Sequence, residues 1–356
     1  MKATLTSLAD LGVDRYRGFL ARCPDALIYA TPEWLSFLER VTGAPPARII
    51  AVVQDDELLA ALPLMTTESD GLVVANALPY FGSHGDALIP DCPDAEERLS
   101  CLADGLDAAF AELHVAAFNI VVHPTEPKLA KVAERMQWRA WDQRIGQISA
   151  LVPAATAAAA MDDVLRSCHQ KTRNLVRKGM KAGFTLRRSR GDDDWDLLAT
   201  HHRLGMERIN GRFKSRDQFE ALRQTFEPHG MCRLYVAERG DVFAGALLLL
   251  KHREWIEYFT PVAVEAFRSE QVLSALIAHA MAESAAEGSS RWNWGGTWLT
   301  QAGVYHFKQG WGAKDHRYSY LGKIRDTAVE DLTPDQVREL FPFFYVKPLP
   351  APTVSP

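Results

Sequence analysis

The sequence is poor in cysteine, and the few cysteines it has are scattered. Five of them, an odd number, occur in 356 residues, and none forms a Cys-x-x-Cys pair. This pattern excludes a disulfide framework and a structural zinc site of the usual spacing. It predicts reduced thiols and a cytoplasmic protein without a bound metal.

Long apolar runs and leader-like segments are missing too. The alanine-rich run Ala154–Ala160 is far shorter than a bilayer requires, so no membrane span is predicted. The first ten residues lack the apolar core of a signal peptide. The net charge of -5 gives no general attraction to DNA or anionic lipid, so an anionic ligand needs a local basic patch.

The motifs of several enzyme classes are also absent. The chain has no His-Glu-x-x-His, no Gly-x-Ser-x-Gly and no P-loop. His201 and His202 are adjacent and face different ways on a helix, which does not suit a metal site.

What the sequence does have is the composition of a globular protein with two domains. Apolar residues make up 47% of the chain and charged residues 24%, which are typical values. The length suits two domains, each with its own core. Pro153 and the alanine run mark a change in composition, which places the linker near residues 150–161.

Patterning predicts the main helices and strands. Thr31 followed by Pro32 is an N-cap with proline at the first helical position, so a helix begins there. Further helices are predicted at Val13–Cys23 and Glu96–Leu113. Strands are predicted at Arg48–Val53, Leu58–Met65, Leu72–Leu78, Ala117–Val122 and Arg317–Ile324.

The chain repeats itself. A shift of 185 positions lays Arg48–Leu64 on Arg233–Leu249 without a gap, and a shift of 174 lays Phe118–Ile120 on Trp292–Trp294. Two matches in the same order predict a duplicated α/β unit. A helix that joins neighbouring strands implies a right-handed crossover and a partly parallel, mixed sheet.

The segment Arg291–Ala313 is the most informative stretch. An aromatic strand runs into Gly295-Gly296, and Val304–Lys308 follows before a second glycine pair, Gly310 and Gly312. Glycines at a strand end allow a sharp turn or a close approach to a ligand. From spacing alone, the segment is interpreted as a tryptophan-rich core strand, an ordinary loop and a solvated lysine.

This segment resembles the closing segment of the Fem-type (FemAB-like) aminoacyl- and acyltransferases, a branch of the Gcn5-related N-acetyltransferase (GNAT) superfamily. In that branch a strand ending in Gly-Gly is followed by a Phe-Lys pair, which Phe307 and Lys308 match here. The resemblance implies an α/β fold of two tandem GNAT-like units. The first would span residues 1–150, completed by 321–356, and the second residues 151–320.

The resemblance also implies a catalytic site. Lys308 would place its charge near the tetrahedral oxyanion or the donor phosphate, with Phe307 as packing support, and Gly295 and Gly296 would let the strand splay. Tyr258 would hydrogen-bond the acceptor or donate a proton, although a half-buried strand tyrosine more often has a structural partner. Because both possible donors are activated, no covalent nucleophile is required.

Basic residues are the candidates for phosphate contacts. Arg173, Arg177 and Lys181 fall at i, i+4 and i+8 on one helical face, which suits a phosphate-bearing donor. The alternative is a solvated helix balanced by the acidic run at 192–194. Arg208 resembles the Fem-type arginine that faces the phosphates of the acceptor, or else it forms a surface ion pair near Glu207.

The donor loop departs from the GNAT superfamily. Coenzyme A-dependent members have a glycine-rich turn between this strand and the next helix, but residues 262–272 contain no glycine. Arg268 and a Ser269 cap would still suit a phosphate. The departure favours the Fem branch, many of whose members take the acyl group from aminoacyl-tRNA.

In the first unit, the loop Tyr80–Asp86 follows a predicted strand. Tyr80, Gly82 and Trp34 are predicted to line a substrate cleft. The peptidoglycan-precursor branch has a lysine about one turn after the tryptophan equivalent to Trp34. Phe37 and Leu38 stand there instead, which argues against a nucleotide-linked muropeptide acceptor.

The sequence therefore predicts an N-acyltransferase that moves an activated acyl or aminoacyl group from tRNA or an acyl thioester. The acceptor would be a primary amine of a small or envelope-precursor molecule, with no tightly bound cofactor and no DNA partner. Two alternatives remain: an ordinary acetyl-coenzyme A-dependent N-acetyltransferase acting on an amino sugar, and a non-catalytic protein that binds a metabolite.

Overall fold

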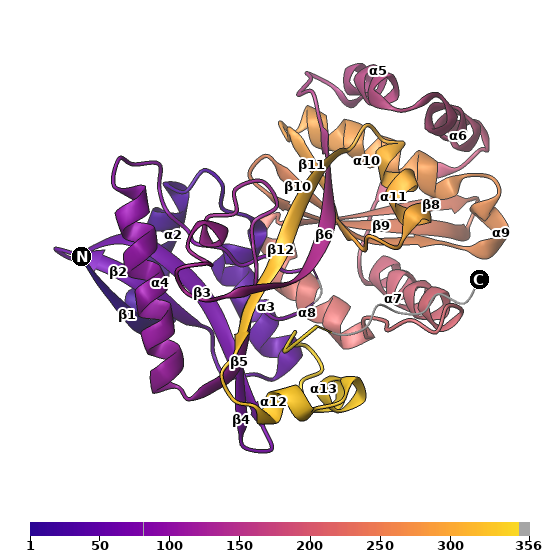
Figure 1. Ribbon diagram of the computed structural model, residues 1–356. Coiled ribbons are helices and arrows are strands. Elements are labelled where there is room, and N and C mark those ends of the chain that lie inside the picture. The colour runs from indigo at the N-terminus through magenta and orange to yellow at the C-terminus, as the bar shows by residue number, and fades with distance from the viewer. Residues whose placement is uncertain (81, 349–356) are drawn as a thin grey trace. The chain divides into compact units, whose positions relative to one another are not determined.

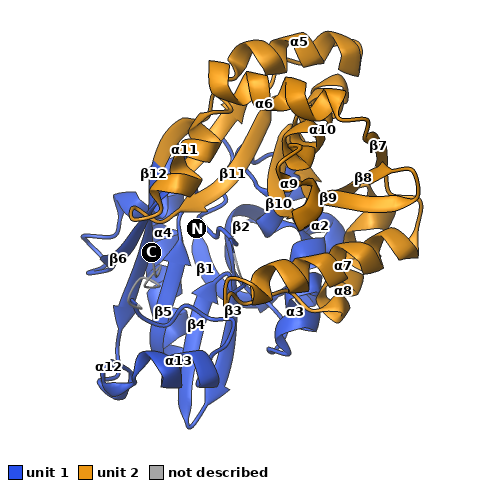
Figure 2. Cartoon of the chain, turned by 90° about the vertical axis from the view of Figure 1, so that its right-hand side faces the viewer, with its two compact units in different colours: residues 1–145, 317–356 blue, residues 146–316 orange. Residues whose placement is uncertain are grey.

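The computed structural model describes residues 1–80 and 82–348 (Figure 1). The chain divides into two compact units, drawn in separate colours in Figure 2. Unit 1 consists of residues 1–145 and 317–356, and unit 2 of residues 146–316. None of the described helices combines the length and apolarity needed to cross a bilayer.

Unit 1 is built on a mixed sheet with the strand order β1-β2-β3-β4-β5-β12. Only the β4–β5 pair is parallel; the other neighbours described here are antiparallel. The strands are β1 (Lys2–Ser7), β2 (Arg48–Gln54), β3 (Glu57–Ser69), β4 (Leu72–Ala77), β5 (Val115–Val121) and β12 (Lys314–Ile324).

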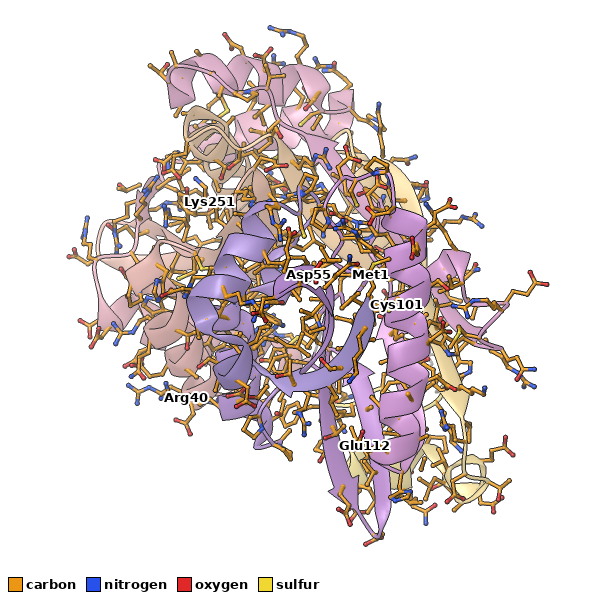
Figure 3. All side chains as sticks on the ribbon, turned by 90° about the vertical axis from the view of Figure 1, so that its left-hand side faces the viewer. Met1, Arg40, Asp55, Cys101, Glu112 and Lys251 are labelled. Carbon is orange, nitrogen blue, oxygen red and sulfur yellow. The ribbon has the colours of Figure 1, made fainter. Side chains whose placement is uncertain are left out.

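The helices of unit 1 begin close to where the sequence predicts. In α3 (Pro32–Thr42), Thr31 Oγ1 accepts a hydrogen bond from the Trp34 amide at 3.2 Å, which confirms the predicted N-cap. Helix α4 (Ala95–Glu112) lies across β1, β2 and β3; Cys101 and Glu112 mark its middle and end in Figure 3. The other helices are α1 (Leu8–Leu11), α2 (Val13–Ala21), α12 (Ala328–Asp331) and α13 (Pro334–Leu340).

Unit 2 has the strand order β11-β10-β9-β8-β7. These strands are β7 (Thr185–Arg188), β8 (Cys232–Arg239), β9 (Val242–His252), β10 (Trp255–Ala263) and β11 (Arg291–Thr297). Strand β6 (Arg139–Ala150) carries the chain from unit 1 into unit 2.

Helices cover both faces of the sheet of unit 2. On one face lie α5 (Ala157–Ser167), α6 (Gln170–Lys181) and α10 (Val272–Ala286), and on the other α7 (Asp192–Glu207) and α8 (Arg216–Phe226) (Figures 1 and 2). The short helices α9 (Glu265–Arg268) and α11 (Ala302–Gln309) complete the unit. Two helical layers around a mixed sheet agree with the predicted α/β class.

The two units repeat the same hairpin in the same register. Arg48 opposes Leu64 in β2–β3, and Arg233 opposes Leu249 in β8–β9, as the shift of 185 requires. Each hairpin also has a register shift at the equivalent place, between Val52 and Val53 and between residues 237 and 238. The predicted internal duplication is therefore confirmed, and it includes the position of the register shift in each hairpin.

The duplicated units differ where their parallel strands end. In unit 1, β4 and β5 pair as far as Ala77 and Ile120. The loop after β4 then folds back, and the Gly85 amide donates to the Val121 carbonyl at 2.8 Å. A Cβ added at Gly85 would lie 1.8 Å from the Ala77 carbonyl oxygen. The backbone of this loop thus fills the space beyond the strand pair.

We expect Gly85→Ala to lower the free energy of unfolding of unit 1 by about 2–3 kcal/mol, because the new methyl group meets backbone that no rotamer change can move. Urea unfolding monitored by fluorescence measures the change. Gly18→Ala is the matched control, because it adds the same methyl group inside α2 where nothing lies within 4 Å. Equal midpoints for the two variants would contradict the close approach at Gly85.

Candidate functional site

The candidate site of unit 2 lies where two parallel strands part. Strands β10 and β11 pair at only three positions, the last of which joins Glu257 to Asn293. Just beyond, β10 has an irregularity between Tyr258 and Thr260 in its pairing with β9, which leaves Phe259 as the extra residue. We call the point where the strands separate, after Glu257 and Asn293, the fork.

A buried carboxylate and a buried amide stand at the apex of the fork. Asn293 Nδ2 donates to Glu257 Oε2 at 2.8 Å, and Asn293 Oδ1 accepts from the Gly295 amide at 2.9 Å. The Gly295 contact fixes which way the Asn293 amide faces. Glu257 is only 4% exposed. Neither residue was predicted as a site residue, although the repeat that lays Asn119 on Asn293 pointed to this position.

Lys308 holds the end of β11. Its Nζ donates to the carbonyls of Gly295 at 3.0 Å and Gly296 at 3.3 Å, and to Thr297 Oγ1 at 2.8 Å. The side chain is 6% exposed, and burial lowers the pKa of its ammonium group from 10.5 to about 8. The interpretation of Lys308 as a solvated lysine is therefore wrong, because helix α11 turns it inward onto the glycine pair.

All three acceptors of the Lys308 ammonium group are neutral, so its charge is not cancelled by a carboxylate. Thr297 extends the contact toward Gln147, with 3.5 Å between their side-chain oxygens, and Gln147 Nε2 donates to the Tyr305 carbonyl at 3.2 Å. This series of hydrogen bonds ties α11 to the strand end. Gln147 and Thr297 were not predicted as site residues.

Tyr258 and Phe307 belong to an aromatic cluster on the α10 face of the sheet. The ring of Tyr258 lies 4.9 Å from that of Trp294, and Phe307 meets Trp294 edge-on at 5.9 Å. Burial raises the pKa of Tyr258 above its usual value, so its hydroxyl group stays protonated. Glu257 is adjacent in an extended strand and points to the opposite face. The catalytic role of Tyr258 stays a prediction.

The two arginines predicted to meet phosphate share one carboxylate. Arg208, at the end of α7, and Arg268, at the end of α9, both form ion pairs with Glu265. Glu207 pairs instead with Arg203 of its own helix. The predicted alternative, a surface ion pair of Arg208 near Glu207, is thus corrected: the carboxylate that Arg208 binds is that of Glu265. Arg208 and Arg268 lie close together, as one anion-binding pair would require.

The basic residues of α6 stay open to solvent. Arg177 and Lys181 are exposed, while Arg173 donates to Gln170 Oε1 at 2.9 Å. The acidic residues 192–194 were predicted, in the alternative interpretation, to neutralise the positive charge of this helix. The run is engaged elsewhere, because Asp194 binds Arg187 and Asp192 binds Arg223.

In unit 1 the predicted cleft residues are part of the packed interior. Trp34 is fully buried, 5.0 Å from the ring of Tyr29 and 5.3 Å from that of Phe37. Tyr80 is also buried, and its amide donates to the Phe343 carbonyl at 2.9 Å. Trp34 and Tyr80 therefore lie inside the packed unit and not along an open cleft, and Phe343 packs against Tyr80. Gly82 has a φ of +82° with open space beside it.

Residues 166–309 match the family model described as an acetyltransferase (GNAT) domain. The matched range contains the fork and Lys308. This part of the chain is thus similar to GNAT acetyltransferase domains, and the match supports the predicted class of N-acyltransferase. No curated protein matches the chain by sequence.

Solved structures share the fold over nearly the whole chain. FemX is similar with a TM-score of 0.71 and 14% identity, over 89% of this chain and 97% of that one. A tandem GNAT protein from the clavulanic acid biosynthesis pathway gives 0.53 and 13%, over 90% and 98%. The C-terminal domain of a putative lysylphosphatidylglycerol synthetase from Agrobacterium fabrum gives 0.52 and 13%, over 89% and 92%. The predicted fold of tandem GNAT-like units is confirmed.

The burial of Lys308 predicts how stability depends on pH. Between the folded pKa of about 8 and the ordinary value of 10.5, the unfolded chain binds one more proton at this residue than the folded chain. Raising the pH through this window therefore favours the folded state. We expect the wild type to gain stability relative to Lys308→Met from pH 8 to pH 10, measured by denaturant unfolding.

Lys181→Met is the control for this experiment, because Lys181 is exposed on α6. The stability difference between this variant and the wild type should stay flat over the same pH range. A flat difference for Lys308→Met as well would mean that the ammonium group is not desolvated.

Proposed function

We propose that unit 2 transfers an activated acyl or aminoacyl group to a primary amine at the fork. The observation that carries this proposal is the separation of β10 and β11 directly after the buried Glu257–Asn293 pair. Separated strand ends expose backbone groups of both strands to an extended donor. The carboxylate at the apex lies where the acceptor amine would meet that donor.

Glu257 is the candidate general base. An amine that is protonated in solution must lose a proton before it attacks, and a positioned carboxylate accepts one. The hydrogen bond from Asn293 Nδ2 holds Glu257 Oε2 and so fixes the orientation of the carboxylate. The Gly295 amide holds Asn293 in turn. A base oriented in this way loses little conformational freedom when the acceptor binds.

Lys308 is the candidate for stabilising the oxyanion of the tetrahedral intermediate. Its ammonium group is buried and contacts only neutral oxygens. A positive charge in a site shielded from water stabilises developing negative charge far more than it would in bulk solvent. To reach the oxyanion, Lys308 exchanges one of its carbonyl acceptors for the oxygen of the donor. Phe307, the preceding residue of α11, meets Trp294 of β11 edge-on and so helps to hold the helix against the strand.

The donor is aminoacyl-tRNA or an acyl thioester of coenzyme A. The exposed basic residues of α6 support a donor that carries phosphates. The acceptor is a small molecule or an envelope precursor with a primary amine. All five cysteines are free thiols, which suits a reducing compartment, and we place the reaction in the cytoplasm.

Replacing the base tests the proposal directly. We expect Glu257→Gln to lower kcat for acyl transfer by about 10²–10⁴-fold while donor affinity stays the same, because an amide cannot take the proton. The donor is identified first, by titration with acetyl-coenzyme A and with a charged-tRNA mixture. Transfer of labelled acyl group to a pool of small amines is then measured.

Glu254→Gln is the matched control, since it makes the same change in the β9–β10 turn. It should leave kcat unchanged. Full activity of Glu257→Gln would remove Glu257 from the chemistry. If the wild type binds neither donor, unit 2 is not a transferase, and the metabolite-binding alternative takes its place.

Salt dependence distinguishes the two donors and tests α6. If the donor is tRNA, the logarithm of its association constant should fall linearly with the logarithm of salt concentration. Changing Arg173, Arg177 and Lys181 together to Gln should then reduce that slope by about 2–3, because each phosphate contact contributes roughly 0.7–0.9.

The control removes three exposed charges from unit 1, at Lys2, Lys131 and Arg139. This variant should keep the wild-type slope. An equal loss of slope in both variants would point to general charge attraction rather than to contacts on α6.

A further inference from the structure

Lys214 stands apart from the other cations of unit 2. It lies between α7 and α8, where its backbone amide donates to His202 Nε2 at 3.1 Å. The next residue, Ser215, caps α8, with its Oγ accepting from the Gln218 amide at 3.2 Å. The backbone around Lys214 is therefore held on both sides, and its side chain starts from a fixed position.

The ammonium group of Lys214 lies over an aromatic ring. Its Nζ is 4.8 Å from the centroid of the Phe259 ring, a cation–π distance. Burial lowers the pKa of the group from 10.5 to about 8. The neighbouring His202 has its pKa lowered to about 4, so it is neutral near pH 7 and adds no charge. Lys214 thus carries the positive charge in the cluster that it forms with His202 and Phe259.

No acceptor in the described part of the chain forms a hydrogen bond or ion pair with Lys214 Nζ. The other cationic groups of unit 2 described above do have acceptors: Arg208 and Arg268 bind Glu265, and Lys308 has three acceptors. A desolvated charge without a counterion is costly, and such charges are usually paired. The ring of Phe259 offsets part of the cost but supplies no negative charge.

Lys214 faces the same side of the sheet as the candidate base. Ile256 packs in the core cluster under α10, and Tyr258 packs against it, so Glu257 between them points to the face that α7 and α8 cover. The loop between α7 and α8 brings Lys214 to Phe259, two residues beyond Glu257. Phe259 is the extra residue of the irregularity in β10, so at most about 7 Å of chain separates it from Glu257. One small molecule is long enough to contact both Glu257 and Lys214.

We propose that Lys214, over the ring of Phe259, binds an anionic group of the acceptor whose amine reaches Glu257. This inference rests on the proposed function and narrows its substrate class. The acceptor is a primary amine that also carries a carboxylate or a phosphate a few bonds away, such as an amino acid or an amino-sugar phosphate. A neutral amine of the same size would lack the ion pair with Lys214.

The test measures anion binding without any donor or turnover. The full chain is titrated by calorimetry with inorganic phosphate and, separately, with acetate. We expect saturable binding of at least one anion, weakened about tenfold or more in Lys214→Met and retained in Lys214→Arg, as the loss of a charge-assisted contact predicts. The anion that binds more tightly identifies phosphate or carboxylate as the group.

Two controls keep this test separate from the proposed function. Lys131→Met removes an exposed lysine of unit 1 and should bind like the wild type, and Glu257→Gln should lose transfer but keep anion binding. Absence of saturable binding in the wild type, or unchanged binding in Lys214→Met, would overturn the proposal. The thermal midpoint of each variant in anion-free buffer shows that it is folded, and Lys214→Arg preserves the charge if Lys214→Met unfolds.

Discussion

The hydrogen bonds from Lys308 to the Gly295 and Gly296 carbonyls are the constraint on which the fork depends. Strand β11 continues past the point where β10 last pairs with it, and the carbonyls of Gly295 and Gly296 find their donor in the Lys308 ammonium group. A lysine supplies three donors from one atom, and its position in α11 brings that helix against the strand end. The hydrogen bonds from Lys308 to the end of β11 therefore account both for the separation of the strands and for the burial of a positive charge.

The two duplicated units share a fold but differ in the residues at corresponding positions of their parallel strand pairs. The pair Glu257–Asn293 of unit 2 corresponds to the pair Asn76–Asn119 of unit 1, because the repeat lays Asn119 on Asn293. In the orientation that satisfies its hydrogen bonds, the Asn76 amide bonds to both backbone groups of Tyr345. In unit 1, the Asn76 amide at this position fixes the C-terminal part of the unit. In unit 2, the Glu257 carboxylate at the corresponding position is able to take a proton.

Regular features of the fold were predictable from the sequence, because they repeat or alternate. The apolar pattern fixes the register of β2–β3 and of β8–β9, since a slip of one residue would turn every side chain to the wrong face. Lys308 was found through its Phe-Lys pair and the glycines before it. Glu257 was missed because a single acidic residue in an apolar strand has no spacing signal. The partner of Arg208 was unpredictable for a different reason: Glu265 is 57 positions away and meets it only in the folded unit.

Unit 2 is one continuous stretch of chain, but unit 1 is not. Strand β5, buried along its whole length, pairs on one edge with residues 320–324 of β12, which follow all of unit 2 in the sequence. During synthesis that edge of β5 stays open until unit 2 has been made, and open strand edges pair readily with other chains. A chain that ends anywhere within unit 2 would thus be inactive and prone to aggregate through the open edge of β5. The first half of the protein is the part that needs chaperones during synthesis.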